Sequence, residues 1–388
     1  VTVGASGALK LASSEEIASL AGAGAVNLQA NTLTLNGGLD TAYSGVMSGA
    51  GSLVKTGTAV FTMSGANTFS GGVNLSAGAI QAGNNAALGT GTVTFSGGRI
   101  SSDSSTTRTL ANAFAMSGAL TLGDVVNNGV MNLGGNVSLL GDVNLTVASA
   151  GTMTGVVSGT YNFVKEGAAE LTLSGVNTFS GTTAVDGGML TLSGGSALAN
   201  TMQLNVNAAG TLKLASSEVI AGLAGAGLVN LQGNTLTLSG SVNTLYSGVM
   251  SGAGTLVKNG AAVFTATAAN TFAGGVRLSA GAFEAGDNAA FGTGLVAFSG
   301  GRISSDSSTA RTLANAFNLS GALTLGDAVN TGTLTLSGNA ALSANTTLTV
   351  ASAATISGIV SGAYNLVKDG AAELTLSGVN TFGGTTAV

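Results

Sequence analysis

Hydrophobic and polar residues alternate along the chain in short runs separated by glycine-containing pairs. Residues 171–173 read Leu-Thr-Leu, which is the two-residue period of a half-buried strand. Valine, threonine, leucine and phenylalanine fill such runs, and Ser-Gly, Gly-Gly, Asn-Gly or Ala-Gly pairs between them mark turns. The pattern predicts many short strands joined by tight turns, with Leu171 and Leu173 facing the core and Thr172 facing outward.

No segment has a helical period of useful length. The best candidate is residues 13–24, where Ser13 could cap a helix and Glu16 stands three positions later. Gly22 and Gly24 then interrupt the run. We expect a short strand and a corner here, and a single helical turn is the alternative.

Two copies of one long unit make up the chain. Residues 97–114, GGRISSDSSTTRTLANAF, return as residues 300–317, GGRISSDSSTARTLANAF, at an offset of 203 residues. The same offset relates Lys165 to Lys368, so no residue has been inserted or deleted between the copies. Loops of globular domains tolerate insertions, whereas a solenoid whose residues stack on neighbouring coils tolerates them less well.

The length of the unit restricts the fold. Short strands fit an antiparallel sandwich, a propeller or a parallel β-helix, but a propeller blade has only about 40–50 residues. We therefore predict an all-β parallel β-helix, or β-solenoid, with coils of about 20–25 residues. Residues 1–203 are the first unit and residues 204–388 a second, incomplete unit of one continuous solenoid. Because both termini fall inside the unit, we expect a fragment of a longer array.

A shorter motif occurs four times. It reads LVKTGTAVFTMSGANTFSGG at 53–72 and FVKEGAAELTLSGVNTFSGT at 163–182, and it recurs at 256–275 and 366–385. In its Asn-Thr-Phe turn, asparagine tolerates left-handed conformations and can bond its own backbone, while phenylalanine fills the layer below. The positions we assign to this structural repeat motif are Lys55, Asn67, Phe69, Lys165, Asn177, Phe179, Lys258, Asn270, Phe272, Lys368, Asn380 and Phe382.

This motif resembles the autotransporter-associated β-strand repeat of bacterial autotransporter passenger domains. The matching residues, in order and with Phe where the family has Tyr, are Leu171, Leu173, Ser174, Gly175, Asn177, Thr178, Phe179 and Gly181. The resemblance covers nearly the whole chain. It implies a right-handed parallel β-helix, exported across the outer membrane to the surface of a Gram-negative-type cell, and it implies no particular activity.

Composition and charge narrow the class further. Hydrophobic residues make up 45% and aromatic residues 4%, so the chain can bury a core that should be narrow. Proline, which cannot donate to a strand ladder, is absent. A net charge of −5 provides no basic surface, so we expect no nucleic-acid partner. No apolar run approaches the roughly 18 residues of a membrane helix, so we expect no membrane insertion within these residues.

Candidate chemistry is sparse. Histidine and cysteine are absent, which excludes Ser-His-Asp and Cys-His arrangements. Aspartates are scattered rather than grouped in calcium-binding runs. Glu15 and Glu16 are adjacent, but neighbours on a strand point to opposite faces and cannot converge as a glycosidase pair. We therefore expect no catalytic residue, no metal site and no cofactor.

Two charged groups have competing interpretations. Arg99, Asp103 and Arg108 could form a ligand patch for sugars or a neighbouring chain, but we favour an Arg–Asp pair that braces a polar loop. Lys165 and Asn177 could form a cross-link promoted by Glu170. We disfavour it because it needs a buried trio, and lysine and glutamate are rarely buried.

Three functions remain. The leading one is mechanical, a rigid extracellular rod, stalk or fibre whose partners are further copies of itself. The second is an adhesin or self-associating module that uses threonine, serine and asparagine ladders to attach to glycans or neighbouring cells. The third, a polysaccharide-active enzyme, is disfavoured because histidine and an acid cluster are missing.

Overall fold

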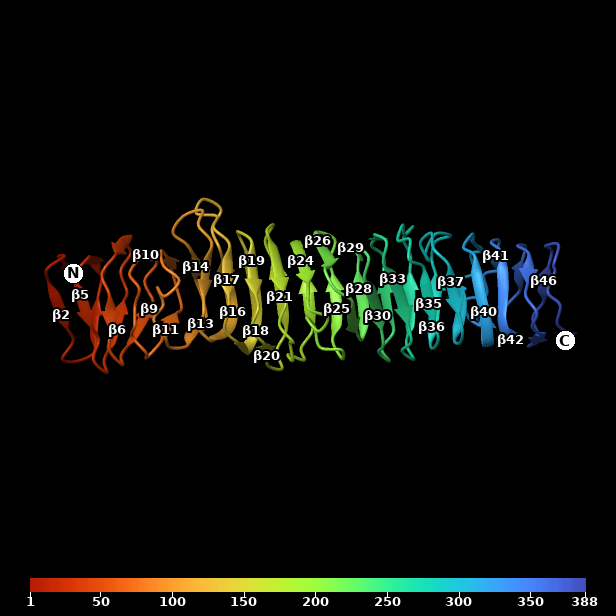
Figure 1. Ribbon diagram of the computed structural model, residues 1–388, viewed down its shortest axis with the longest axis horizontal. Coiled ribbons are helices and arrows are strands. Elements are labelled where there is room, and N and C mark those ends of the chain that lie inside the picture. The colour runs from red at the N-terminus through yellow and green to blue at the C-terminus, as the bar shows by residue number, and fades with distance from the viewer. The chain divides into compact units, whose positions relative to one another are not determined.

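The computed structural model describes residues 1–388, which form two compact units, residues 1–197 and residues 198–388. Each unit consists of short strands without any helix (Figure 1). Within each unit, every strand pairing is parallel and joins consecutive coils, so each unit is a β-solenoid, as the sequence predicted. Leu53 pairs with Val73, for example, a step of 20 residues.

Three parallel ladders run through the first unit. The first ladder contains β3 (Glu15–Ile17), β6 (Thr32–Leu35), β9 (Ser52–Lys55), β11 (Val73–Leu75), β13 (Val93–Phe95), β16 (Phe114–Leu122), β18 (Val137–Val147) and β20 (Val157–Ser158). The second contains β1 (Thr2–Val3), β4 (Ala21–Gly22), β7 (Thr41–Tyr43), β10 (Val60–Met63), β12 (Ala79–Ala82), β14 (Arg99–Ser102), the later halves of β16 and β18, β21 (Phe163–Glu166) and β23 (Thr183–Val185). The third contains β2 (Ala8–Lys10), β5 (Ala25–Asn27) and β8 (Met47–Ser48), and resumes with β15 (Arg108–Leu110), β17 (Met131–Leu133), β19 (Gly151–Met153), β22 (Glu170–Leu173) and β24 (Gly188–Leu192).

The second unit repeats this plan. Its first ladder contains β27 (Glu218–Ile220), β30 (Thr235–Leu238), β33 (Thr255–Lys258), β35 (Val276–Leu278), β37 (Val296–Phe298), β40 (Phe317–Leu325), β42 (Ala340–Val350) and β44 (Val360–Ser361). Its second contains β25 (Gln203–Val206), β28 (Gly222–Gly225), β31 (Thr244–Tyr246), β34 (Val263–Ala266), β36 (Ala282–Ala285), β38 (Arg302–Ser305), the later halves of β40 and β42, β45 (Leu366–Asp369) and β47 (Thr386–Ala387). Its third contains β26 (Gly210–Leu214), β29 (Leu228–Asn230) and β32 (Met250–Ser251), and resumes with β39 (Arg311–Leu313), β41 (Leu334–Leu336), β43 (Ala354–Ile356) and β46 (Leu374–Leu376).

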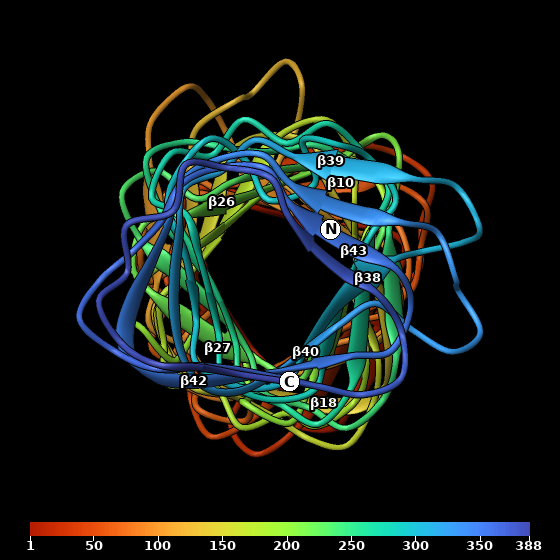
Figure 2. The ribbon, with the colours of Figure 1, turned by 90° about the vertical axis from the view of Figure 1, so that its right-hand side faces the viewer.

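In each unit the coils surround an interior (Figure 2), and the buried apolar side chains form the core there. In β22, Leu171 and Leu173 are buried while Thr172 is only half-buried, so the predicted alternation is confirmed. Burying these apolar side chains is the main favourable term for such a narrow core. The candidate helix at 13–24 is instead β3, a corner and β4, so the helical alternative is wrong.

Two long strands in each unit span two ladders. β16 pairs through its first half with β13 and through its second half with β14, and the pairing with β18 shifts register between Met116 and Gly118. Gly118 has a φ of +78°, a conformation that costs a glycine little. The step from Gly118 to its partner Val143 is 25 residues, so this coil contains more residues than the 20-residue coils elsewhere.

The third ladder is interrupted for two coils in each unit. After β8, residues 64–72 and 83–92 form no strand on this face, and the ladder resumes only at β15. In the second unit the interruption falls between β32 and β39. The first strand after each interruption therefore pairs on one side only, with β17 or with β41.

Candidate binding groove and the repeat motif

The lysines of the repeat motif are buried rather than solvated. Lys55, Lys165 and Lys258 lie almost completely inside the solenoid. The Lys165 ammonium donates hydrogen bonds to the carbonyl oxygens of Gly167 and Gly187, at 2.6 and 2.7 Å. Lys55 and Lys258 donate in the same way to the carbonyls two residues ahead, and so does Lys368, which is partly exposed. The general rule that lysine is rarely buried, which we used against the cross-link, therefore does not hold for these lysines.

Burial changes the acidity of these lysines. Removal from water lowers the pKa of Lys165 and of Lys258 to about 8, because desolvation disfavours the charged form. Burial also lowers the pKa of Lys55, and the nearby Asp40 carboxylate partly opposes this shift. The backbone carbonyls that accept hydrogen bonds from these ammonium groups belong to turns. Each lysine therefore links a turn to the coil on which the lysine itself lies.

The asparagines of the motif join three consecutive coils. Oδ1 of Asn177 accepts a hydrogen bond from the Val157 N–H, and its Nδ2 donates to the Ala197 carbonyl, both at 2.7 Å. Asn67 and Asn270 make the same two bonds, and Asn380 accepts from Val360. These asparagines have negative φ. The expectation of a left-handed turn that bonds its own backbone is therefore wrong, because the side chain bonds the backbones of the preceding and following coils instead.

The phenylalanines of the motif fill the interior beside these asparagines. Phe69, Phe179 and Phe272 are fully buried, and Phe382 is half-buried. The ring of Phe179 meets the ring of Phe163 edge to face, with centroids 6.1 Å apart. The predicted role of these rings as layer fillers agrees with this burial.

Successive motifs occupy different faces of the solenoid. Lys55 lies on β9 in the first ladder, whereas Lys165 lies on β21 in the second. Widened coils at β16 and β18 separate the two motifs and shift the later one onto the next face. The motif is therefore a bonding pattern within the coils and does not build one continuous surface.

The proposed lysine–asparagine cross-link has no support in the geometry. The Lys165 ammonium bonds two backbone carbonyls, and the Asn177 carboxamide bonds two others. Glu170 accepts a hydrogen bond from Thr191. Each of the three groups is satisfied by a different partner, so no reactive trio is assembled.

The charged cluster braces its loop, as we favoured. Arg108 pairs with Asp103 at 2.8 Å and its Nε donates to the Ala82 carbonyl, which holds the loop that follows β14. Arg99 pairs instead with Asp124. Both pairs recur in the second unit, where Arg302 also pairs with Glu284, at 3.1 Å.

The acidic residues do not converge. Glu15 and Glu16 are exposed, and they accept hydrogen bonds from Ser13 and Asn36, respectively. No group of three or more aspartates or glutamates is arranged to hold a metal ion.

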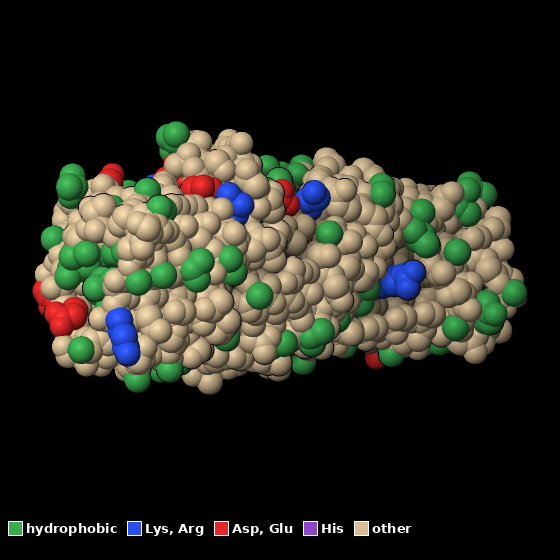
Figure 3. Space-filling view, turned by 60° about the vertical axis from the view of Figure 1, so that its left-hand side comes forward, with side chains coloured by type: hydrophobic (Ala, Val, Ile, Leu, Met, Phe, Trp, Pro, Cys, Tyr) green, Lys and Arg blue, Asp and Glu red, His purple; other side chains and the backbone are tan.

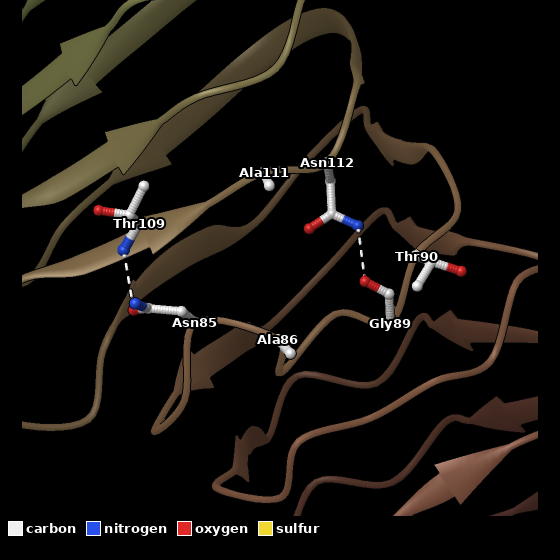
Figure 4. Close-up of a pocket in the computed structure, with 7 residues that line it drawn as sticks. All are labelled: Asn85, Ala86, Gly89, Thr90, Thr109, Ala111 and Asn112. Atoms are coloured by element: carbon white, nitrogen blue, oxygen red, sulfur yellow. Dashed lines mark hydrogen bonds between the residues drawn. The ribbon is translucent and has the colours of Figure 1, made fainter.

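A groove lies beside β15, where the third ladder resumes (Figure 4). It has a volume of about 370 Å³. Its lining residues are Asn85, Ala86, Gly89, Thr90, Thr109, Ala111 and Asn112. Asn85 Oδ1 accepts a hydrogen bond from the Thr109 N–H at 3.0 Å, so this side chain occupies part of the place of the missing strand.

The second unit carries the same groove beside β39. Its volume is about 290 Å³, and it is lined by Asn288, Ala289, Gly292, Thr293, Ala314 and Asn315. Asn288 accepts a hydrogen bond from the Thr312 N–H, at 2.9 Å. Our reading of the sequence missed both grooves, because the segments that form them look like ordinary turns. The only sequence feature that could have indicated the grooves is that their lining residues are of the same types in both units.

The surface around these features is weakly charged. In the face shown in Figure 3, charged side chains are few, and apolar side chains are scattered among polar and backbone atoms. The most exposed apolar residues include Val125 and Val126, on the loop that follows Asp124. The structure has no helix with the length and apolarity needed to span a bilayer.

Comparisons with known proteins agree with the repeat motif. The passenger-associated transport repeat family matches residues 53–82, 163–192, 249–285 and 366–388, which contain the four motif copies. The adhesin BmaC autotransporter of Brucella suis biovar 1 (strain 1330) is 30% identical over 263 residues, or 63% of this chain. The chain spans only 7% of the length of that protein. The chain therefore carries the passenger-associated transport repeat of autotransporter passengers, as its motif indicated.

Proposed function

We propose that this chain is a non-enzymatic, structural part of a passenger displayed at the bacterial surface. The observation that carries the proposal is the use of the repeat motif. Its lysine and asparagine side chains bond the backbone of the solenoid, and its phenylalanines fill the interior. Because these side chains contact other parts of the solenoid, the motif directs no reactive group toward solvent. A stalk that extends by adding coils, and so has further copies of itself as partner, is the function that such a motif serves best.

Deletion of one whole unit tests the stalk. The deletion removes residues 55–257, which are 203 residues. It joins residue 54 to residue 258, the counterpart of Lys55 in the second copy. In the full-length protein, such a deletion should keep surface display and shorten the surface projection by roughly 40–50 Å, as expected for nine or ten coils. Electron microscopy of gold-labelled cells measures this height. An unchanged height with normal display would contradict the stalk.

The alternative function is adhesion, and the name of the relative favours it. The matched relative is called an adhesin. On this alternative, the solenoid surface itself attaches to glycans, to neighbouring cells or to a second copy. The same deletion variant separates the two functions. A stalk role predicts reduced height with attachment retained by the rest of the protein, whereas an adhesive role predicts loss of attachment in proportion to the sequence removed.

A further inference from the structure

The edge of β15 that faces the groove has backbone groups without a partner. In a parallel ladder, alternate residues bond to opposite neighbours. Arg108 and Leu110 bond toward β17, which leaves Thr109 and Ala111 directed toward the groove. The Thr109 N–H is taken by Asn85, but the Thr109 carbonyl and the Ala111 N–H have no hydrogen bond within the protein. One acceptor and one donor of this strand therefore stay available.

A buried side chain adds a second acceptor. Asn112 is only 6% exposed, and its Nδ2 donates to the carbonyls of Gly89 and Gly91 at 3.1 and 2.8 Å. Its oxygen has no partner, and Figure 4 shows it turned away from Gly89 toward the part of the groove between Ala86 and Ala111. This oxygen is open to the groove and can accept a hydrogen bond from an N–H donor outside the fold.

The same arrangement occurs in the second unit. Asn315 is 6% exposed, and its Nδ2 donates to Gly292 and Gly294, while its oxygen has no partner. The Thr312 N–H is again taken by an asparagine, and Ala314 again has a free N–H beside it. The groove of the second unit, built from the repeated sequence, thus presents the same kinds of donor and acceptor.

The lining excludes several ligand classes. No charged side chain lines either groove, so neither a phosphate nor a carboxylate has a counter-ion there. No aromatic ring lines them to stack on a sugar. The lining side chains are small. The groups without a partner are a backbone N–H, a backbone carbonyl and a carboxamide oxygen, and an extended polypeptide backbone can pair with all three.

We propose that these grooves bind an extended, uncharged segment of another polypeptide by strand addition to β15 and β39. Its backbone N–H groups reach the Thr109 carbonyl and the Asn112 oxygen, and one of its carbonyls accepts from Ala111. Because Ala86, Gly89 and Ala111 line the groove, the segment presents small side chains toward it. Edge strands recruit partners in this way, and the main-chain bonds supply the affinity. The inference does not depend on the proposed stalk role.

A synthetic peptide tests the proposal on the full 388-residue chain. The probe is a fluorescent copy of residues 331–339, TGTLTLSGN, which is uncharged and contains β41. We expect saturable binding, measured by fluorescence anisotropy, with two sites per chain. The control peptide has proline in place of Thr333 and Thr335, the two threonines on either side of Leu334. It lacks N–H groups needed for pairing and should not bind.

Two pairs of variants give opposite expected shifts. Ala111→Pro with Ala314→Pro removes a donor that the fold does not use, and should weaken binding about tenfold, the usual effect of one lost hydrogen bond. Ala111→Ser with Ala314→Ser keeps the donor and should bind normally. Asn85→Ala with Asn288→Ala frees the Thr109 and Thr312 N–H groups for the peptide, and should tighten binding severalfold.

The outcome with the asparagine variants decides the case even if the proline variants fold poorly. Tighter binding after Asn85→Ala supports strand addition, because the side chain only competes with the peptide backbone. Weaker binding would overturn it, since the asparagine would then itself be a ligand-binding group. No binding of the probe to the intact chain, or equal binding of the proline control peptide, would also overturn it.

Discussion

At the scale of single residues, the hydrophobic alternation was predictable and the polar core was not. Leu171 and Leu173 face inward because a two-residue period permits no other assignment. Lys165 looks like a solvated charge in the sequence, since lysine is rarely buried. Its acceptors include Gly187, on the next coil and 22 residues later, so only the stacking reveals that the ammonium has partners.

Removing one asparagine bridge should destabilise the first unit. Asn177→Ala removes both hydrogen bonds and leaves the Val157 N–H without this acceptor in a buried place, and we expect a loss of about 1–3 kcal/mol. Thr172→Ala, on the half-buried face of β22, is the matched control and should cost far less. Denaturant titration measures both. Equal losses in the two variants would show that the bridge contributes nothing.

The buried lysines predict that stability rises with pH above about 8. Lys165 and Lys258 have a pKa of about 8 in the folded protein and an ordinary pKa of 10.5 when unfolded. Between these values, the unfolded chain binds more protons, so raising the pH favours the folded state. Above pH 10 the trend should reverse, because burial raises the pKa of Tyr43 to about 12 and the unfolded chain loses that proton first.

The midpoint of urea unfolding, measured from pH 7 to 11, tests this dependence. We expect the midpoint to increase from pH 8 to a maximum near pH 10. The triple variant Lys55→Met, Lys165→Met, Lys258→Met removes all three buried lysines whose pKa is lowered, and its midpoint should not increase over that range. A parallel increase in the variant would assign the effect to other residues.

At the scale of elements, the sequence predicts short parallel strands but not where a ladder stops. The turn pairs that bound each strand are visible in the sequence, and the coil length follows from the repeat. The interruption of the third ladder before β15 is invisible, because residues 84–91 resemble the turns that precede any strand. Asn85 and Asn112 look like turn formers, and only the stacking shows one capping an edge and the other facing a groove.

A single-residue insertion should be harmful in a ladder and harmless in a loop. An alanine inserted after Thr152, inside β19, moves Met153 from the core face to the outer face and breaks the pairing with β22. An alanine inserted after Ser105 lengthens the exposed loop that follows β14 and should be tolerated. Melting temperatures of the two variants make the comparison. Similar melting temperatures would mean that β19 is not held in register.

At the scale of the molecule, the fold class and the presence of passenger-associated transport repeats follow from the sequence, because successive coils repeat the same stacking pattern. Each unit is a solenoid of parallel ladders, and the motif that marks the family supplies its polar bonds. What binds to the surface could not be predicted from the same pattern. The repeat pattern shows how the coils stack, whereas the two grooves that we propose as binding sites lie beside β15 and β39, where the third ladder is interrupted.

The most direct test of this account is disulfide cross-linking between neighbouring coils. The chain has no cysteine, so engineered pairs report without interference. Thr152 and Thr172 are directly paired in parallel on β19 and β22, within the separation that a disulfide bridges. Under mild oxidation, Thr152→Cys with Thr172→Cys should form an intramolecular disulfide, whereas Thr152→Cys with Asn162→Cys should not. Cross-linking of the second pair but not the first would contradict the stacked parallel solenoid.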